Sequence, residues 1–169
     1  MQIIRRKMRN NMVRDITITG LADEEIDLLH YLVDEFVLSH SSLRFRDNYW
    51  SLVRDWLLRV KNEENSRVLA AKSGRRIIGF AVGQILDNGP MLFPEKIGYG
   101  GIMVVGTEFR KGGIGDVLWN AMKDWFLLKG IGQVETYTEC GNRVAENFWE
   151  NHGFSIFLNR RRCRIAEHS

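Results

Sequence analysis

The fold of this chain is decided by one stretch, VVGTEFRKGGIG, at residues 104–115. The apolar run 102–105 has the composition of a strand. After Gly113, apolar residues recur at helical spacing, namely Val117, Leu118, Ala121, Met122, Trp125 and Phe126. We therefore expect a strand, a glycine-rich turn and the start of a helix. Glycines let a ligand approach the backbone, and the first N–H groups of a helix have no partner within it, so the arrangement suits an anion such as phosphate.

The spacing of the glycines separates this turn from two other phosphate-binding motifs. A Walker loop needs Gly, four residues and Gly-Lys-Ser/Thr, and no such spacing follows Gly106. A dinucleotide fingerprint needs a third glycine where this chain has Leu118. Arg110, Gly113 and Gly115 instead fill the pattern Arg/Gln-x-x-Gly-x-Gly/Ala. This resembles the pyrophosphate-binding signature of the GCN5-related N-acetyltransferase (GNAT) family. The alternative is a strand-to-helix turn with incidental glycines.

A second block, NRVAENFWENHGF at residues 142–154, resembles the same family's Asn-x-x-Ala-x-x-Phe-Tyr-x-x-x-Gly-Phe block. The residues alone predict an N-cap at Asn142, a short helix over 143–152 and a stop at Gly153. The apolar face of that helix contains Ala145, Phe148 and Trp149. Taken alone, this block favours a core-packing helix. The two blocks in this order, one helix and one strand apart, are more specific, and the resemblance covers residues 68–160.

Composition places the chain among ordinary globular proteins. It has 169 residues, 44% hydrophobic and 27% charged, and we expect a flexible basic arm over 1–11 and a single domain over 12–169. A net charge of +3 is too small to argue for nucleic acid. Two cysteines, Cys140 and Cys163, indicate no disulfide framework, so a cytoplasmic location is the default expectation. No apolar run is long enough to span a membrane. We also expect no metal site.

Hydrophobic periodicity and turn residues predict the remaining elements. Strands are expected at 13–19, 67–72, 76–86, 96–105, 133–140 and 154–165, and helices at 23–38, 46–61, 113–129 and 143–152. A hairpin turn is expected at Ser73-Gly74, and the glycines at 98, 100 and 101 suggest a bulge or a close ligand. The order predicts an α/β fold. The resemblance implies a mixed, mostly antiparallel sheet of six to seven strands flanked by about four helices.

The resemblance also implies how acetyl-CoA is held. Pantetheine would pass between the strands that end at Val105 and Cys140, along the backbone of Met103, Val104 and Val105. The pyrophosphate would contact N–H groups of Lys111, Gly112, Gly113, Ile114, Gly115 and Asp116. Arg110 and Lys111 would add positive charge, Asn142 and Trp149 would contact the cofactor, and the N–H of Met103 would polarise the thioester carbonyl. The first two helices and their loop would line the acceptor pocket.

The catalytic residues match the family less well. The usual proton donor is the Tyr of Phe-Tyr, and this chain has Trp149 there, whose indole cannot supply a proton at neutral pH. The usual Glu base falls at Gly100 or Gly101, and a second base position falls at Tyr137. Period-two spacing would place Glu135, Tyr137 and Glu139 on one strand face. Tyr137 and Glu139 are the candidates for a base acting through water, although cross-strand or solvated roles remain open.

Two functions follow from these expectations. The first is an N-acetyltransferase that moves an acetyl group from acetyl-CoA to a primary amine by direct attack in a ternary complex. The acceptor would be a small molecule, a protein N-terminus or a lysine. The alternative is a catalytically weak acyl-CoA-binding sensor or regulatory module of the same fold. The resemblance also allows a homodimer.

Overall fold

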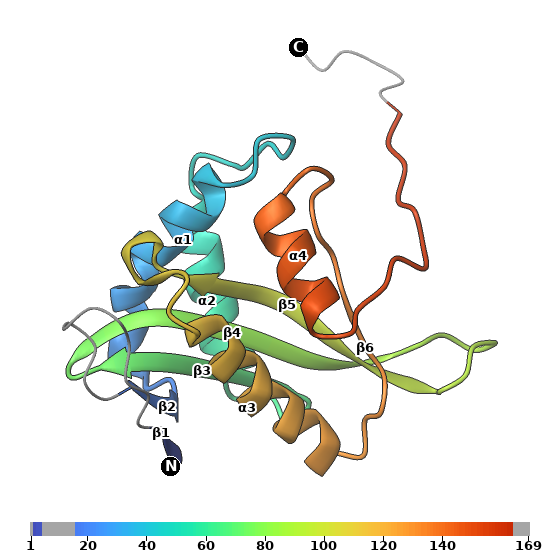
Figure 1. Cartoon of the computed structure of the whole chain (residues 1–169), viewed down its shortest axis with the longest axis horizontal. Coiled ribbons are helices and arrows are strands. Elements are labelled where there is room, and N and C mark those ends of the chain that lie inside the picture. Colours follow the sequence, from blue (N-terminus) through green and yellow to red (C-terminus); the bar gives the residue numbers. More distant parts are fainter. Residues whose placement is uncertain (1, 5–15, 164–169) are drawn as a thin grey trace. The chain divides into compact units, whose positions relative to one another are not determined.

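The computed structural model describes residues 2–4 and 16–163. The chain divides into two compact units, Met1–Tyr137 and Thr138–Ser169. The first unit contains a six-stranded sheet in the order β1-β2-β3-β4-β5-β6 with helices packed against it (Figure 1). The predicted α/β fold class, a mixed and mostly antiparallel sheet flanked by helices, is confirmed. Within the described ranges, no helix combines the length and the apolar character needed to cross a membrane.

The strands follow the predicted order with differences at the ends of the chain. Their bounds are β1 Gln2–Ile4, β2 Ile16–Gly20, β3 Ser66–Ser73, β4 Arg76–Asp87, β5 Lys96–Val105 and β6 Val134–Thr136. Neighbours pair antiparallel except β5 and β6, which are parallel. The predicted hairpin is confirmed, since Ser73 pairs with Arg76 and Gly74 has a φ of 59°.

The N-terminal arm differs from its prediction where the structure describes it. Gln2–Ile4 was expected to be flexible, but it pairs with β2 as a strand, because β2 offers an edge not used by β3. The rest of the predicted arm, 5–11, and the start of the predicted strand, 13–15, lie outside the described residues.

The α-helices lie where the apolar periodicity predicts them, whereas the short 3₁₀ helix η2 was not predicted. Their bounds are η1 Asp23–Leu29, α1 His30–Leu38, α2 Tyr49–Val60, η2 Thr107–Phe109, α3 Ile114–Leu128 and, in the second unit, α4 Arg143–Asn151. The first predicted helix, 23–38, begins with a 3₁₀ segment (η1) before it becomes α-helical at His30.

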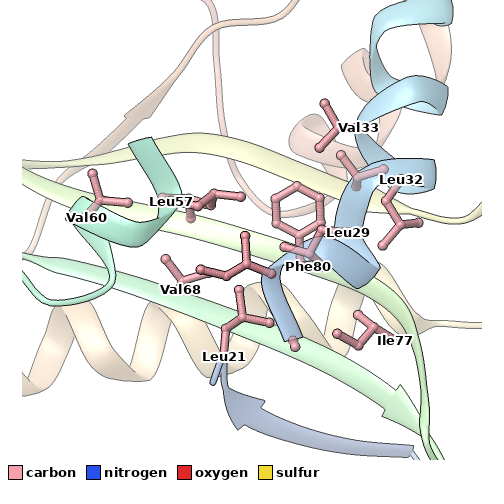
Figure 2. Close-up of a cluster of buried hydrophobic side chains, with 13 residues drawn as sticks. Leu21, Leu29, Leu32, Val33, Leu57, Val60, Val68, Ile77 and Phe80 are labelled. Atoms are coloured by element: carbon pink, nitrogen blue, oxygen red, sulfur yellow. The ribbon is translucent and has the colours of Figure 1, made fainter. Parts of the chain in front are cut away.

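One face of the sheet is covered by η1, α1 and α2. Leu29 and Leu32 from the first helices and Leu57 from α2 are fully buried against Phe80 of β4 (Figure 2). Ile102 and Val104 of β5 pack on the same cluster. Burial of each large side chain contributes about 1.5–3 kcal/mol. This cluster therefore fixes α1 relative to β5.

The opposite face of the sheet is covered by α3, which approaches the strands at glycines. A Cβ at Gly79 would lie 2.8 Å from the carbonyl oxygen of Val104 and 3.3 Å from the Leu118 side chain. A Cβ at Gly98 would lie 2.8 Å from the Phe126 ring. The absence of side chains at these positions lets α3 lie close to β4 and β5.

In the second unit, α4 is confirmed with its caps. The Asn142 side chain accepts a hydrogen bond from the Ala145 N–H, and Gly153 has a φ of 84° just after the helix. The predicted strand 154–165 is wrong over its described part, because residues 154–163 form neither helix nor strand. A strand requires hydrogen bonds to a neighbouring strand. Apolar composition alone does not supply such a neighbour, as the exposed run Ile156, Phe157 and Leu158 shows.

We expect Gly79→Ala to destabilise the protein by about 1–3 kcal/mol, because its Cβ would overlap a backbone oxygen that cannot move independently of β5. Urea unfolding measures the change. Gly20→Ala is the matched control, since this strand glycine has nothing within 4 Å of an added Cβ. Equal stabilities of the two variants would contradict the close packing described for β4 and β5.

Lys72→Met should reduce stability at neutral pH by about 0.5–1 kcal/mol and have little effect in acid. Lys72 donates a hydrogen bond to Glu25 at 2.5 Å, and this bond is the main reason that the pKa of Glu25 lies below its ordinary value. A carboxyl group whose pKa is lowered on folding stabilises the folded state at pH values above its ordinary pKa. This contribution is lost as the pH falls through the pKa of the folded state. Urea unfolding at pH 7 and pH 3 measures both effects.

Lys129→Met is the matched control for this experiment, because the partner of Lys129 is the exposed Glu64 at 3.7 Å. A pH-independent effect of Lys72→Met would show that the ion pair to Glu25 does not carry the stabilisation.

Candidate functional site

The site begins at a bulge in β5. Gly83 of β4 pairs with Gly100, and Ala81 pairs with Met103, so β5 has one more residue than β4 between these pairs. The extra residue falls in the segment Gly101–Ile102 and reverses which face the following side chains use. The bulge expected from the glycines of this strand is confirmed.

Beyond the bulge, β5 and β6 no longer pair. Their parallel ladder joins Gly98–Gly100 to Val134–Thr136, and the Thr136 hydroxyl donates to the Gly100 carbonyl at 2.9 Å. In the described part of the chain, no strand continues this ladder along residues 101–105. The edge of β5 is thus open where the sequence predicted the pantetheine arm, at Met103, Val104 and Val105.

The predicted strand 133–140 is wrong over its C-terminal residues 137–140. The strand stops at Thr136, which pairs with Gly100, and the bulge in β5 follows directly after this last pair; a bulge bends its strand and ends regular pairing. Glu139 lies in a turn, where its carbonyl accepts a hydrogen bond from the Asn142 N–H at 3.0 Å. The interpretation that Glu135, Tyr137 and Glu139 share one strand face is therefore wrong for Glu139.

The turn between η2 and α3 has two residues in the left-handed region. Lys111 has a φ of 63°, unusual for a residue with a side chain, and Gly113 has a φ of 78° at the N-cap of α3. Within the described residues, no side chain caps this helix. The N–H groups of Ile114 and Gly115, in the first helical turn, have no acceptor within the helix, and the helix dipole adds positive potential there. This geometry suits an anion with several oxygens.

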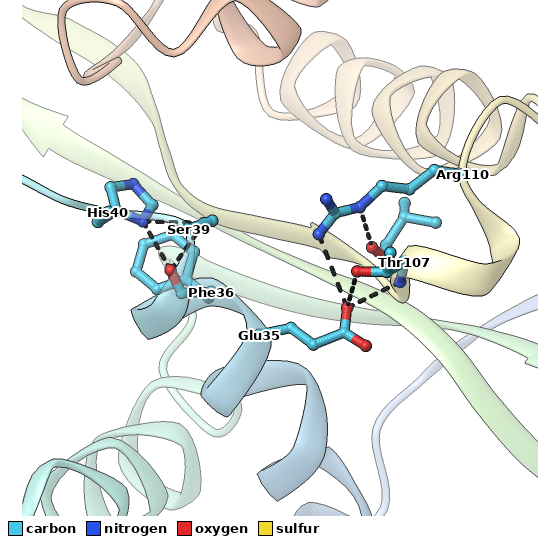
Figure 3. A network of polar contacts seen from close by, with 7 residues as sticks. Glu35, Phe36, Ser39, His40, Thr107 and Arg110 are labelled. Atoms are coloured by element: carbon cyan, nitrogen blue, oxygen red, sulfur yellow. Dashed lines mark hydrogen bonds and ion pairs between the residues drawn. The ribbon is translucent and has the colours of Figure 1, made fainter.

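Arg110 is held by the protein itself. Its Nε donates to the Val105 carbonyl at 3.0 Å, and a terminal nitrogen lies 3.6 Å from Oε2 of Glu35 (Figure 3). Its charge is therefore partly neutralised by Glu35. Lys111 is exposed and has no ion-pair partner among the described residues, so it is the better candidate for contact with an anion. Glu35 is a candidate site residue that sequence reasoning missed.

A second group of side chains faces the α1–α2 side of the sheet. Val134 and Thr136 lie close to where a Cβ would stand at Gly98 and Gly100, on the α3 side of the sheet, so Glu135 between them lies on the opposite face. Glu135 pairs with Tyr99 of β5 in the parallel ladder. Because side chains alternate along a strand, Tyr99 points to the face opposite to that of its neighbour Gly98, which is the face that Glu135 shares.

Tyr137, just after β6, completes this group. Its ring centroid lies 5.4 Å from that of Tyr99, and its side chain is largely exposed. In the described residues, neither a hydrogen bond nor an ion pair engages the carboxylate of Glu135. Tyr99 was missed in the sequence because only the register of β5 with β6 places it beside Glu135.

The remaining predicted residues belong to the second unit. Oδ1 of Asn142 caps α4, which leaves the N–H donors of the amide for other contacts. The Trp149 ring packs 5.0 Å from Phe148 and 4.8 Å from Phe154. Among residues 2–4 and 16–163, no three His, Cys, Asp or Glu side chains are placed to hold a metal ion.

Comparison with known proteins identifies one family. Residues 27–154 match the Acetyltransferase (GNAT) family, and this match crosses the boundary between the two units. A search of curated proteins finds no match.

Solved structures resemble the chain over most of its length. A tetramutant of a Bacillus halodurans protein has a TM-score of 0.77 and 20% identity, covering 88% of this chain and 99% of its own. Aminoglycoside N-acetyltransferase AAC(6')-Iy in complex with CoA has a TM-score of 0.68 and 17% identity, covering 88% and 95%. An aminoglycoside acetyltransferase from an uncultured soil metagenomic sample, in complex with sisomicin, has a TM-score of 0.64 and 17% identity, covering 90% and 97%. At these identities the likeness shows the fold.

Proposed function

We propose that this chain, which belongs to the acetyltransferase (GNAT) family, transfers an acetyl group from acetyl-CoA to a primary amine in a ternary complex. The observation that carries the proposal is the uncapped N-terminus of α3, preceded by the left-handed Lys111 and Gly113 and by the open edge of β5. These elements lie in the order needed for an extended arm that ends in a diphosphate. The CoA complex of one solved relative supports this choice of co-substrate.

The residues present fit a diphosphate. Glycines at 112, 113 and 115 leave the backbone of the turn accessible, and Lys111 is exposed beside it. The N–H groups of residues 111–116 are proposed to hold the phosphate oxygens. The backbone of Met103, Val104 and Val105 is proposed to hold the arm. The Val105 carbonyl already accepts a hydrogen bond from Arg110, so Val105 would use its remaining backbone hydrogen-bonding capacity. Asn142 and Trp149 remain proposed contacts by resemblance.

Acetyl-CoA supplies an activated thioester, so the protein must orient the amine, remove its proton and polarise the thioester carbonyl. We propose that the Met103 N–H donates to that carbonyl. The amine reaches the enzyme mostly as an ammonium ion, which a carboxylate and aromatic faces attract. Glu135, Tyr99 and Tyr137 offer this combination on the side of α1 and α2. Either Glu135 or the predicted Glu139 would accept the proton, directly or through water.

The acceptor is proposed to be a small molecule or a peptide amine. Two similar solved structures are aminoglycoside acetyltransferases, one in complex with sisomicin, and they make aminoglycosides the first acceptors to try. We also propose a cytoplasmic location, the default for a chain whose two cysteines indicate no disulfide framework.

The alternative function is an acyl-CoA sensor without efficient turnover. Trp149 occupies the position of the family's usual acid, and Gly100 and Gly101 occupy that of its usual base. These substitutions favour a sensor if no amine accepts the acetyl group.

Gly113→Ala should weaken coenzyme A binding at least tenfold, measured by isothermal titration. A Cβ would strain the left-handed backbone by about 1–2 kcal/mol and would stand where the phosphate approaches. Gly130→Ala is the matched control, because Gly130 has a φ of 75° just after the other end of α3. It should lose similar stability and keep its affinity. Equal affinities in all three proteins would contradict the proposed diphosphate site.

Glu135→Gln should lower kcat/KM for the best amine of a panel by about 10²–10⁴-fold, the range for loss of a general base, with coenzyme A affinity unchanged. Thiol release measures the rate. Glu139→Gln and Tyr137→Phe are assayed in parallel. A large loss in Glu139→Gln alone would assign the base to Glu139. Full activity in all three variants would refute Glu135, Tyr137 and Glu139 as the groups that remove the proton.

A further inference from the structure

Glu35 of α1 binds the turn that precedes α3. Its Oε2 accepts hydrogen bonds from the N–H of Thr107 at 2.7 Å and from the hydroxyl of Thr107 at 2.9 Å. The same oxygen forms the ion pair with Arg110 (Figure 3). One carboxylate oxygen thus holds both ends of the segment 107–110 to a helix 72 residues earlier in the sequence.

The contacts of Glu35 replace a missing local cap. Thr107 is the first residue of η2, and its N-cap, Gly106, has no side chain to satisfy the N–H groups at the start of the helix. Glu35 supplies the acceptor with a full negative charge, and charge-assisted hydrogen bonds are roughly twice as strong as neutral ones. The side chain of Glu35 is only 29% exposed, so solvent screens these contacts incompletely.

The helix that carries Glu35 is itself fixed. Its buried side chains Leu32 and Val33 belong to the main core. Its last turn is closed by the Ser39 hydroxyl, which donates to the Phe36 carbonyl at 2.8 Å, and by Nδ1 of His40, which lies 2.7 Å from the same oxygen. The position of Glu35 is therefore set by the core and not by the turn.

A different contact holds the other side of the same turn. Arg76 of β4 pairs with Glu108 at 2.5 Å and lies over the Phe109 ring at 4.9 Å. Both partners of this ion pair are more than half exposed. It does not touch Arg110, the residue next to the left-handed Lys111. The two contacts thus allow a matched comparison within one turn.

We propose that Glu35 is a positioning residue for the anion-binding turn. It holds η2 and Arg110 so that the backbone of Lys111–Gly113 is already in its binding conformation before the diphosphate arrives. A carboxylate does not bind a diphosphate itself, because both are negatively charged, so its effect passes through Thr107 and Arg110. This inference rests on the proposed function, and it extends it by assigning to α1 a role in cofactor affinity.

The test uses Glu35→Ala, Glu35→Gln and the control Glu108→Ala in the full chain. Isothermal titration with coenzyme A should show a dissociation constant about tenfold higher for Glu35→Ala. Glu35→Gln should stay within about threefold of wild type, because its amide oxygen still accepts from Thr107. Glu108→Ala should also stay within threefold. Hydrogen exchange without ligand should be faster at residues 107–112 in Glu35→Ala and near wild type in Glu35→Gln.

Several results would overturn the inference. Wild-type or tighter affinity in folded Glu35→Ala would do so, as would an equal loss in Glu108→Ala, which would indicate general loosening of the turn. Failure of wild-type protein to bind coenzyme A would overturn the proposed function. Hydrogen exchange would then still decide the role of Glu35, since unchanged exchange in Glu35→Ala would show that it does not order the turn.

Discussion

One extra residue in β5 is the constraint on which the candidate site depends. It falls in Gly101–Ile102, opposite the single residue Val82 of β4. Before the bulge, β5 pairs with β6, and after it the two strands separate. If β6 continued to pair with β5 beyond the bulge, the backbone N–H and C=O groups of that edge would bond to each other and leave none for a ligand. The bulge thus creates the open edge and also directs β5 toward the turn at the start of α3.

The packing on the two faces of the sheet explains why this irregular strand is stable. On one face, Ile102 and Val104 are held by the cluster around Phe80. On the other face, α3 is drawn onto the sheet at glycine positions, so its N-terminus lies beside the end of β5. Glu35 then joins the two layers at the turn. The irregular backbone is supported by regular elements on both sides, which is the general condition for a preorganised site.

Local signals in the sequence predicted most of the fold. Periodicity located α2, α3 and α4, and Ser73-Gly74 located the hairpin, because these features depend on neighbours along the chain. The start of α3 was predicted from its glycines for the same reason. The errors concern strands whose existence depends on distant partners. The segment 137–140 lacked a neighbour because of the bulge, and residues 154–163 form no strand despite their apolar composition.

For the candidate site, the sequence predicted the backbone geometry of the turn before α3 but not the side-chain contacts around it. The turn at 110–116 carries its own signature, but the ion pair that engages Arg110 comes from α1 and has no local signal. Tyr99 and Glu135 become neighbours only through the register of β5 with β6.

The most direct test of the account is the change in backbone amide NMR shifts when unlabelled coenzyme A is added to ¹⁵N-labelled protein. We expect the largest changes at the amides of residues 112–116, with a second group at 103–105. Large changes elsewhere, with the amides of 112–116 unmoved, would show that the ligand binds at another place and would contradict the assignment of the turn.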